Sequence, residues 1–144
     1  MAEPFLARLL GLQGRSETPA QELALAALLV RVARADGHYD EAEARRIDQA
    51  LIAWHGMGPF EAARLRGAAE KLEAAAPDTV RFTRALKDGV ALEDRTGLIQ
   101  ALWSVALSDG QRGADEEALI RLVASLLGVS DQDSARARQR AAAR

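Results

Sequence analysis

Apolar side chains recur at helical spacing along almost the whole chain. They occupy positions i, i+3, i+4 and i+7, which lie on one face of an α-helix. Two such stripes are formed by Leu25, Leu28, Leu29 and Val32 and by Leu119, Ile120, Val123 and Leu127. No window shows the strict alternation of apolar and polar residues that is typical of a strand. The pattern therefore predicts an all-α fold.

Residues typical of helix ends divide the chain into its elements. Asp40 precedes Glu43 by three residues in a capping arrangement, and Thr18, Pro19 and Gln21 form a second helix start. Further starts are marked by Gly58-Pro59, Asp78, Asp115 and Ser130. The expected helices lie near 19–35, 41–55, 59–74, 79–88, 93–108 and 115–128, with a short helix near 4–11 and a last one from about 131. We therefore expect a bundle of six to seven helices.

The sequence contains an internal repeat with a constant offset of 73 residues. Leu29, Val32, Ala33, Asp36, Gly37, Glu43 and Ile47 correspond to Leu102, Val105, Ala106, Asp109, Gly110, Glu116 and Ile120. Each copy holds an apolar helix, an Asp-Gly corner and a second helix with a glutamate in its first turn. We call residues 36–43 the first corner and residues 109–116 the second corner. Two pseudo-symmetric helical hairpins are expected, with the apolar helices packed at the centre and both corners at one end.

Length and composition favour one globular unit. The 144 residues correspond to a single domain, which we place at 1–130, followed by an arginine-rich C-terminal helix or tail at 131–144. Hydrophobic residues make up 49% of the chain, so an aliphatic core can form. The formal net charge of −2 is too even for a global nucleic-acid-binding charge. Electrostatic function must therefore be local.

The residue types that are missing exclude several function classes. The chain has no cysteine, which removes thiolate catalysis, thiolate zinc sites and disulfides. The longest uncharged run, 96–108, is shorter than the roughly 20 apolar residues of a membrane span. Residues 1–12 lack the features of a secretory signal, so we expect a cytoplasmic protein, and the scarcity of lysine beside abundant alanine is typical of a GC-rich bacterial source.

Two aspartates occupy positions that a helix alone does not favour. Asp36 and Asp109 fall on the last turns of the two apolar helices, where a carboxylate opposes the helix dipole at a cost of roughly 0.3–1 kcal/mol. A divalent cation would resolve this misfit, because Ca²⁺ and Mg²⁺ take oxygen ligands from carboxylates. The candidate ligands are Asp36, Asp40, Glu43, Asp109, Asp115 and Glu116, with Glu41 and Glu117 less well aimed.

The same residues also have a purely structural interpretation. Gly37 and Gly110 can end helices as left-handed caps, and Asp40 and Asp115 can cap the helices that follow. Neither corner contains the Asp-x-Asp-x-Asp-Gly spacing of the twelve-residue calcium loop, so an EF-hand is excluded. Cation binding and local capping therefore both remain open from spacing alone.

The chain resembles the tellurite-resistance TerB-like family. The resemblance rests on Ala35-Asp36-Gly37, Asp40 and Glu43, then Asp109-Gly110 and Glu116 before Leu119-Ile120, and it covers about 22–127. It implies a small all-helical domain with metal-holding acidic clusters at its corners and a link to resistance against tellurite and other stresses. It implies no enzymatic reaction. Because the same domain type is attached to DnaJ-like co-chaperones, the resemblance implies fold and acidic site more firmly than a physiological role.

The acidic positions of the family are matched more completely in the first corner than in the second. Asp36, Glu43, Asp109 and Glu116 match in both corners, and Asp40 matches in the first. In the second corner Gly113 takes the place of Asp40, and Asp115 lies two residues later. We therefore expect the first corner to supply most of the ligands for Ca²⁺, Mg²⁺ or Mn²⁺, with Zn²⁺ a weaker candidate.

Other features suggest weaker alternatives. His38 and His55 are better explained as a loop residue and a helix-end residue than as ligands, and Trp54 and Trp103 as core filling. An arginine stripe at Arg136, Arg138, Arg140 and Arg144 could bind an acidic partner, although no aromatic residue interleaves it for nucleic-acid stacking. The stripe is expected to bury little surface, because the apolar pattern ends by Leu127. Apolar residues at Phe5, Leu6, Leu9, Leu10 and Leu12 could dock on a partner chain or back on the bundle.

These observations favour a non-catalytic protein. No phosphate-binding loop, Gly-x-Ser-x-Gly elbow or His-Glu-x-x-His motif is present. The leading hypothesis is an acidic, divalent-cation-binding protein of stress or tellurite resistance. The alternative is a helical adaptor that recruits an unknown protein partner, with the acidic corners serving only the fold. Neither hypothesis includes a membrane span or nucleic acid, and a homodimer is compatible with both.

Overall fold

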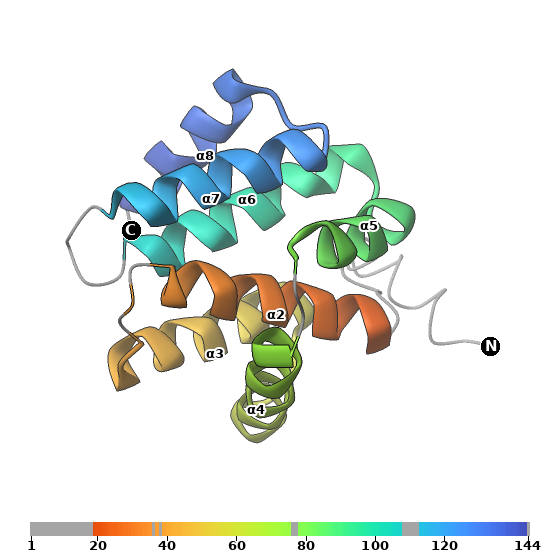
Figure 1. Ribbon diagram of the computed structural model, residues 1–144, viewed down its shortest axis with the longest axis vertical. Coiled ribbons are helices and arrows are strands. Elements are labelled where there is room, and N and C mark those ends of the chain that lie inside the picture. The colour runs from red at the N-terminus through yellow and green to blue at the C-terminus, as the bar shows by residue number, and fades with distance from the viewer. Residues whose placement is uncertain (1–18, 36, 38, 76–77, 108–112, 144) are drawn as a thin grey trace.

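The computed structural model describes residues 19–35, 37, 39–75, 78–107 and 113–143. Over these residues the chain forms seven α-helices and no strand. The helices are α2 (Pro19–Arg34), α3 (Glu41–His55), α4 (Pro59–Ala75), α5 (Val80–Gly89), α6 (Leu92–Ala106), α7 (Ala114–Leu126) and α8 (Asp131–Ala142). The predicted all-α bundle is thus confirmed (Figure 1), whereas the helix expected near 4–11 lies outside the described residues.

Local capping chemistry places the helix ends close to where the sequence predicts them. Asp40 has an extended backbone and its Oδ1 accepts a hydrogen bond from the Glu43 backbone N–H at 2.9 Å. Ser130 caps α8 in the same way, accepting from the Asp133 N–H at 3.1 Å. Gly56 ends α3 with a φ of 71°, a left-handed conformation that glycine adopts without steric penalty.

One expected cap is wrong. Asp115 lies inside the first turn of α7, and the residue in the N-cap position is Gly113. The reason is the side chain of Glu116, because a Cβ built on Gly113 would lie 2.5 Å from its Oε1. Glu116 therefore reaches back over the N-cap residue, as the glutamate of a capping box does, and the helix starts at Ala114, one residue before Asp115.

The two apolar helices form the centre of the bundle. In α2 every residue from Ala24 to Val30 is buried, and in α6 the buried residues include Leu98, Ile99 and Leu102. The two helices pack against each other, as the repeat predicts. Within the described helices none is long and apolar enough to cross a membrane.

The repeat extends to a third helix, which the sequence analysis did not recognise. Helix α4 packs on α2, and α8 packs on α6 in the same way. A shift of 72 residues, one fewer than for the hairpins, superposes the left-handed Gly56 on Gly128 and the starts of α4 and α8. It also aligns the inward-facing residues Ala62, Leu65 and Ala69 with Ser134, Ala137 and Ala141. The halves are therefore α2-α3-α4 and α6-α7-α8, with α5 between them.

The arginine-rich C-terminal helix is part of this packing. Ser134, Ala137 and Ala141 are buried against α6, and Trp103 Nε1 donates a hydrogen bond to Ser134 Oγ at 3.2 Å. The expectation that this segment buries little surface is therefore wrong. Its inward face consists of small side chains, which give no apolar stripe in the sequence but let α8 approach α6 closely.

Candidate metal centre

Two glutamates at repeat-equivalent positions are buried. Glu43 in α3 and Glu116 in α7 are each only 2% exposed. Both occupy the third position of their helix, behind the N-cap residues Asp40 and Gly113. A carboxylate is almost never buried to this degree unless it is paired or bound to a metal ion. A carboxylate interacts favourably with the partial positive charge of a helix N-terminus, and both glutamates are in the first turn of their helix.

The aspartates expected beside these glutamates are placed differently. Asp40 is exposed, and one of its carboxylate oxygens already accepts the capping bond from Glu43 N–H. Asp115 is exposed in the first turn of α7. Asp36 and Asp109, together with His38, lie outside the described residues. The structure thus places four of the six candidate ligands, two of them buried and two at the surface.

The helix ends that carry these residues gather at one end of the bundle. In Figure 1 the last turns of α2 and α6 and the first turns of α3 and α7 all lie toward the left side of the view. This agrees with the arrangement expected from packing the two apolar helices together. Among the residues that the structure describes, no three His, Asp or Glu side chains are grouped closely enough to hold a metal ion. The described donors are oxygen atoms, which suit a hard cation, but they do not complete a coordination shell.

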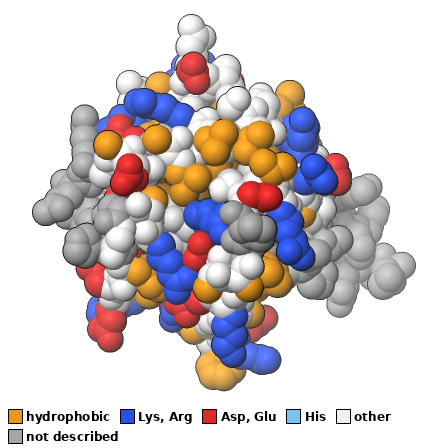
Figure 2. All heavy atoms as spheres, viewed as in Figure 1, with side chains coloured by type: hydrophobic (Ala, Val, Ile, Leu, Met, Phe, Trp, Pro, Cys, Tyr) orange, Lys and Arg blue, Asp and Glu red, His pale blue; other side chains and the backbone are white. Residues whose placement is uncertain are grey.

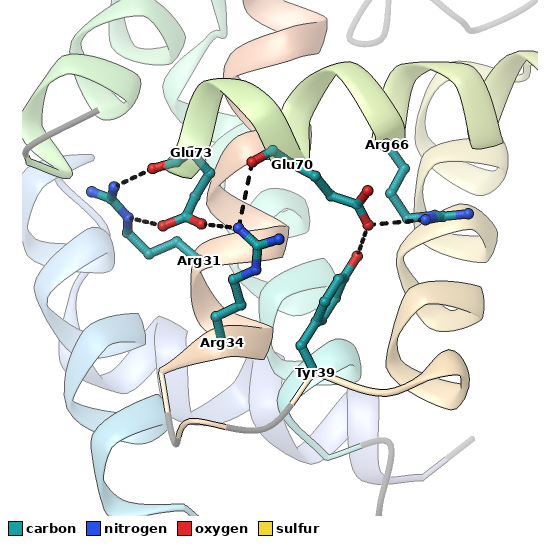
Figure 3. A network of polar contacts seen from close by, with 6 residues as sticks. All are labelled: Arg31, Arg34, Tyr39, Arg66, Glu70 and Glu73. Carbon is teal, nitrogen blue, oxygen red and sulfur yellow. Dashed lines mark hydrogen bonds and ion pairs between the residues drawn. The ribbon is translucent and has the colours of Figure 1, made fainter. Parts of the chain in front are cut away.

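The first corner is attached to α4 through a tyrosine. Tyr39 Oη donates a hydrogen bond to Glu70 Oε2 at 2.5 Å, and Arg66 Nη1 contacts the same oxygen at 3.0 Å (Figure 3). Arg66 Nε also binds Asp48 Oδ1 of α3 at 2.6 Å, which raises the pKa of the guanidinium. Burial, and then the hydrogen bond to Glu70, raise the pKa of the Tyr39 phenol above its usual value. These contacts hold the residue next to Asp40 against α4.

A second set of ion pairs joins α2 to α4 beside this tyrosine. Glu73 accepts from Arg31 Nε at 3.0 Å and from Arg34 Nη1 at 2.6 Å (Figure 3). The Arg34 guanidinium also lies over the Tyr39 ring, 5.0 Å from its centroid. The sequence analysis missed this network, because its hydrogen bonds to Glu70 and Glu73 of α4 come from residues 31 to 42 positions away.

The remaining candidates have structural roles. The His55 side chain is 1% exposed in the last turn of α3, with Nδ1 3.9 Å from Glu22 Oε2. Burial, and then the charge of Glu61, raise the pKa of Glu22. Trp103 is buried and Trp54 is partly buried, as expected for core-filling residues.

The arginine stripe on α8 is partly engaged within the molecule. Arg138 Nη2 is 3.4 Å from Glu117 Oε2, and its guanidinium lies 4.9 Å from the Trp103 ring centroid. Arg136 is 3.5 Å from Asp133 within α8, and Arg144 lies outside the described residues. On the face shown in Figure 2, acidic and basic side chains are interspersed rather than separated. That face therefore carries no broad field of one sign.

Comparison with protein families finds a match over most of the chain. Residues 22–139 match the family model described as tellurite resistance protein TerB. The match runs from the first turn of α2 into α8 and so includes both three-helix halves. Neither a curated protein nor a solved structure matches the chain significantly. With both buried glutamates inside the matched region, the chain belongs to the TerB family of tellurite resistance proteins.

Proposed function

We propose that this TerB protein acts without catalysis in resistance to tellurite and related stress by binding a divalent cation at its two corners. The observation that carries the proposal is the burial of Glu43 and Glu116 at equivalent positions of the repeat, each 2% exposed. Local capping alone requires a glutamate near a helix start, but it does not require that glutamate to be buried in both halves.

The proposed ligand set consists of oxygen donors. Glu43 and Glu116 supply buried carboxylates, and Asp36 and Asp109, which follow α2 and α6 in the sequence, are proposed to supply further carboxylates. Such donors suit Ca²⁺, Mg²⁺ or Mn²⁺ better than Zn²⁺, which takes nitrogen and sulfur ligands more readily. The bound cation would neutralise acidic charge at one end of the bundle and join the two hairpins there.

The two corners are proposed to contribute unequally. The first corner adds Asp40, one of whose oxygens remains outside the capping bond to Glu43. The second corner has Gly113 in that place, with the Glu116 carboxylate folded against it, and an exposed Asp115. The first corner therefore offers more carboxylate oxygen, which favours tighter binding there.

Isothermal titration calorimetry with Ca²⁺, Mg²⁺, Mn²⁺ and Zn²⁺ tests the proposal. Glu43→Gln and Glu116→Gln keep the side-chain shape but remove the charge, and each is expected to weaken binding by about tenfold or more, or about 1.4 kcal/mol. Glu41→Gln is the matched control, because Glu41 is in the same turn as Glu43 but its side chain is 92% exposed. This control should bind as the wild type does.

Thermal unfolding gives a second readout. A cation at a hundred times its Kd should raise the free energy of unfolding by about 2.7 kcal/mol through linkage. Unchanged melting with all four ions at millimolar concentration would refute cation binding. The adaptor hypothesis, in which the corners serve only the fold, would then be the better account of the family resemblance.

A further inference from the structure

A groove of about 540 Å³ lies along α6, with α3 on one side and the end of α8 on the other. Its residues on α3 follow the helical spacing i, i+3, i+4, i+7 and i+8, and its residues on α6 follow the same spacing. The α3 set is Arg46, Gln49, Ala50, Ala53 and Trp54, and the α6 set includes Gly97, Gln100, Ala101 and Ser104. The groove has the size of a pocket for a small organic molecule.

The corresponding stripe of α2, in the other half of the repeat, is covered by α5. The Arg31 guanidinium lies 5.3 Å from the Phe82 ring centroid near the start of α5. A Cβ built on Gly89, at the end of α5, would overlap the Gln21 side chain. Helix α5 therefore runs along α2 from Arg31 to Gln21. The α2 residues between these two that correspond to the groove floor are buried, and they are Ala24, Ala27 and Leu28.

The floor and wall of the groove are smaller and more polar than their repeat equivalents. On the floor, Ala27 is replaced by Gln100 and Leu28 by Ala101, and both replacements are only partly buried. On the wall, the α7 segment has Leu119, Leu122, Val123, Leu126 and Leu127 at the positions where α3 has Arg46, Gln49, Ala50, Ala53 and Trp54. An apolar helix laid over this surface would bury amide groups without hydrogen-bond partners. The groove therefore suits an occupant that carries polar groups of its own.

Arg46 gives one end of the groove a positive charge. No other charged residue is present among the described residues that line it. Within the described chain no carboxylate forms an ion pair with Arg46, whereas its neighbour Arg45 pairs with Glu41 at 3.4 Å. The planar guanidinium matches a carboxylate through two parallel hydrogen bonds. Gln49, one turn after Arg46, can donate a further hydrogen bond to the same group.

The other end of the groove is aromatic. Trp54 packs closely on α6 there, because a Cβ built on Gly97 would lie 2.7 Å from Trp54 Cζ3. Arg46 and Trp54 are eight positions apart on α3, which corresponds to about 12 Å along a helix axis. Small side chains such as Ala50 and Ala101 line the space between these two ends. A ligand that fits this arrangement has an anionic group at one end and a flat apolar body.

We propose that the groove between α3, α6 and α8 binds a small aromatic carboxylate. The carboxylate pairs with Arg46, and the ring lies over the small residues of the floor toward Trp54. The amide of Gln100 provides a hydrogen bond along the edge of the ligand. The proposal goes beyond cation binding and does not depend on it, since none of the proposed cation ligands lines the groove.

NMR titration of the ¹⁵N-enriched full chain with 2-naphthoate tests the proposal. Two compounds separate its parts, because 2-naphthamide has the same ring without the charge and acetate has the carboxylate without the ring. We expect 2-naphthoate to shift the amide signals of Ala53 and Ala101, which line the groove. It should bind at least about tenfold more tightly than either of the other two compounds.

Two neighbouring arginines give a matched pair of variants. Arg46→Gln should remove the preference for 2-naphthoate over 2-naphthamide. Arg45→Gln should keep it, because Arg45 does not line the groove and pairs with Glu41. Both residues are exposed on α3, so both variants are expected to fold.

Filling the floor gives an independent test. Ala101→Leu introduces the residue that α2 has at the equivalent position 28, and it should weaken 2-naphthoate binding at least about tenfold. Ala118→Leu, at an exposed position of α7 outside the groove, is the control, and circular dichroism checks the fold of both. The proposal is overturned if millimolar 2-naphthoate shifts no groove signal, or if 2-naphthamide binds as tightly. It is also overturned if Arg46→Gln and Arg45→Gln have equal effects, or if folded Ala101→Leu binds as the wild type does.

Discussion

Tyr39 is the only tyrosine in the chain, so its ionisation can be followed directly by ultraviolet absorbance. Burial, followed by the hydrogen bond to Glu70, raises the pKa of the phenol. Because the pKa is higher in the folded state, the protonated Tyr39 phenol contributes to stability. This contribution is complete below the unfolded-state pKa, near 10, and is lost as the pH rises through the folded-state pKa.

We therefore expect the free energy of unfolding to fall above about pH 10 because the unfolded chain releases this proton first. A spectrophotometric titration should show Tyr39 ionising at higher pH in the folded protein than in urea. Glu70→Gln should move the folded-state titration toward that of the unfolded chain, because it removes the carboxylate charge. An identical titration in folded and unfolded chains would contradict the placement of Tyr39.

A substitution at Gly113 tests the role of a single residue in the second corner. Gly113→Ala places a Cβ at 2.5 Å from Glu116 Oε1 and so displaces the buried carboxylate. We expect a loss of about 1 kcal/mol, the size of a lost helix cap, together with weaker cation binding. Urea denaturation and calorimetry measure the two effects. Gly67→Ala is the control, since its Cβ meets nothing within 4 Å in the middle of α4 and should stabilise the helix by about 0.5–1 kcal/mol.

For single residues, the sequence predicts the roles that depend on neighbours a few positions away in the chain. The capping role of Asp40 is predictable because its acceptor and the Glu43 N–H are three residues apart. Glu43 is predictable as a candidate ligand, but its burial is not, because burial depends on helices that pack over the corner. The Tyr39–Glu70 bond joins residues 31 positions apart, so no local spacing could indicate it.

At the scale of the element, α8 shows that a polar composition can conceal a packed helix. Ala137 faces α6 with no exposed surface, whereas Ala135 on the same helix is exposed. Ala137→Leu should overpack the contact and lower the free energy of unfolding by about 1–3 kcal/mol. The matched change Ala135→Leu should leave it nearly unchanged, and urea denaturation compares the two. Equal effects would mean that α8 does not pack on α6 through this face.

The helix boundaries were predictable because glycine, proline and capping residues mark them locally. The pairing of α4 with α2 and of α8 with α6 was not, because its register differs by one residue from that of the hairpins. The shift of 72 that relates Gly56 to Gly128 could have revealed the third helix of the repeat. The sequence did not indicate that α8 belongs to the repeat, because small residues such as Ser134 and Ala137 form no apolar stripe and are equally common on exposed helix faces.

At the scale of the whole molecule, the contact between α2 and α6 joins the two halves into one core. Leu29 and Leu102 are repeat-equivalent and are 0% and 1% exposed. Leu29→Ala and Leu102→Ala should each lower the free energy of unfolding by about 2–5 kcal/mol. Unfolding followed by circular dichroism and by tryptophan fluorescence should coincide in both variants. Two separate transitions would show that the halves unfold independently.

Because both halves of the repeat lie in one chain, the two corners can differ in sequence. In a symmetric homodimer every substitution appears at both equivalent places, so neither can change alone. Here Asp40 in one half is matched by Gly113 in the other, and each can alter without the other. A single polypeptide can thus keep an aspartate at one corner and a glycine at the equivalent place of the other, an asymmetry that a dimer of identical chains cannot have.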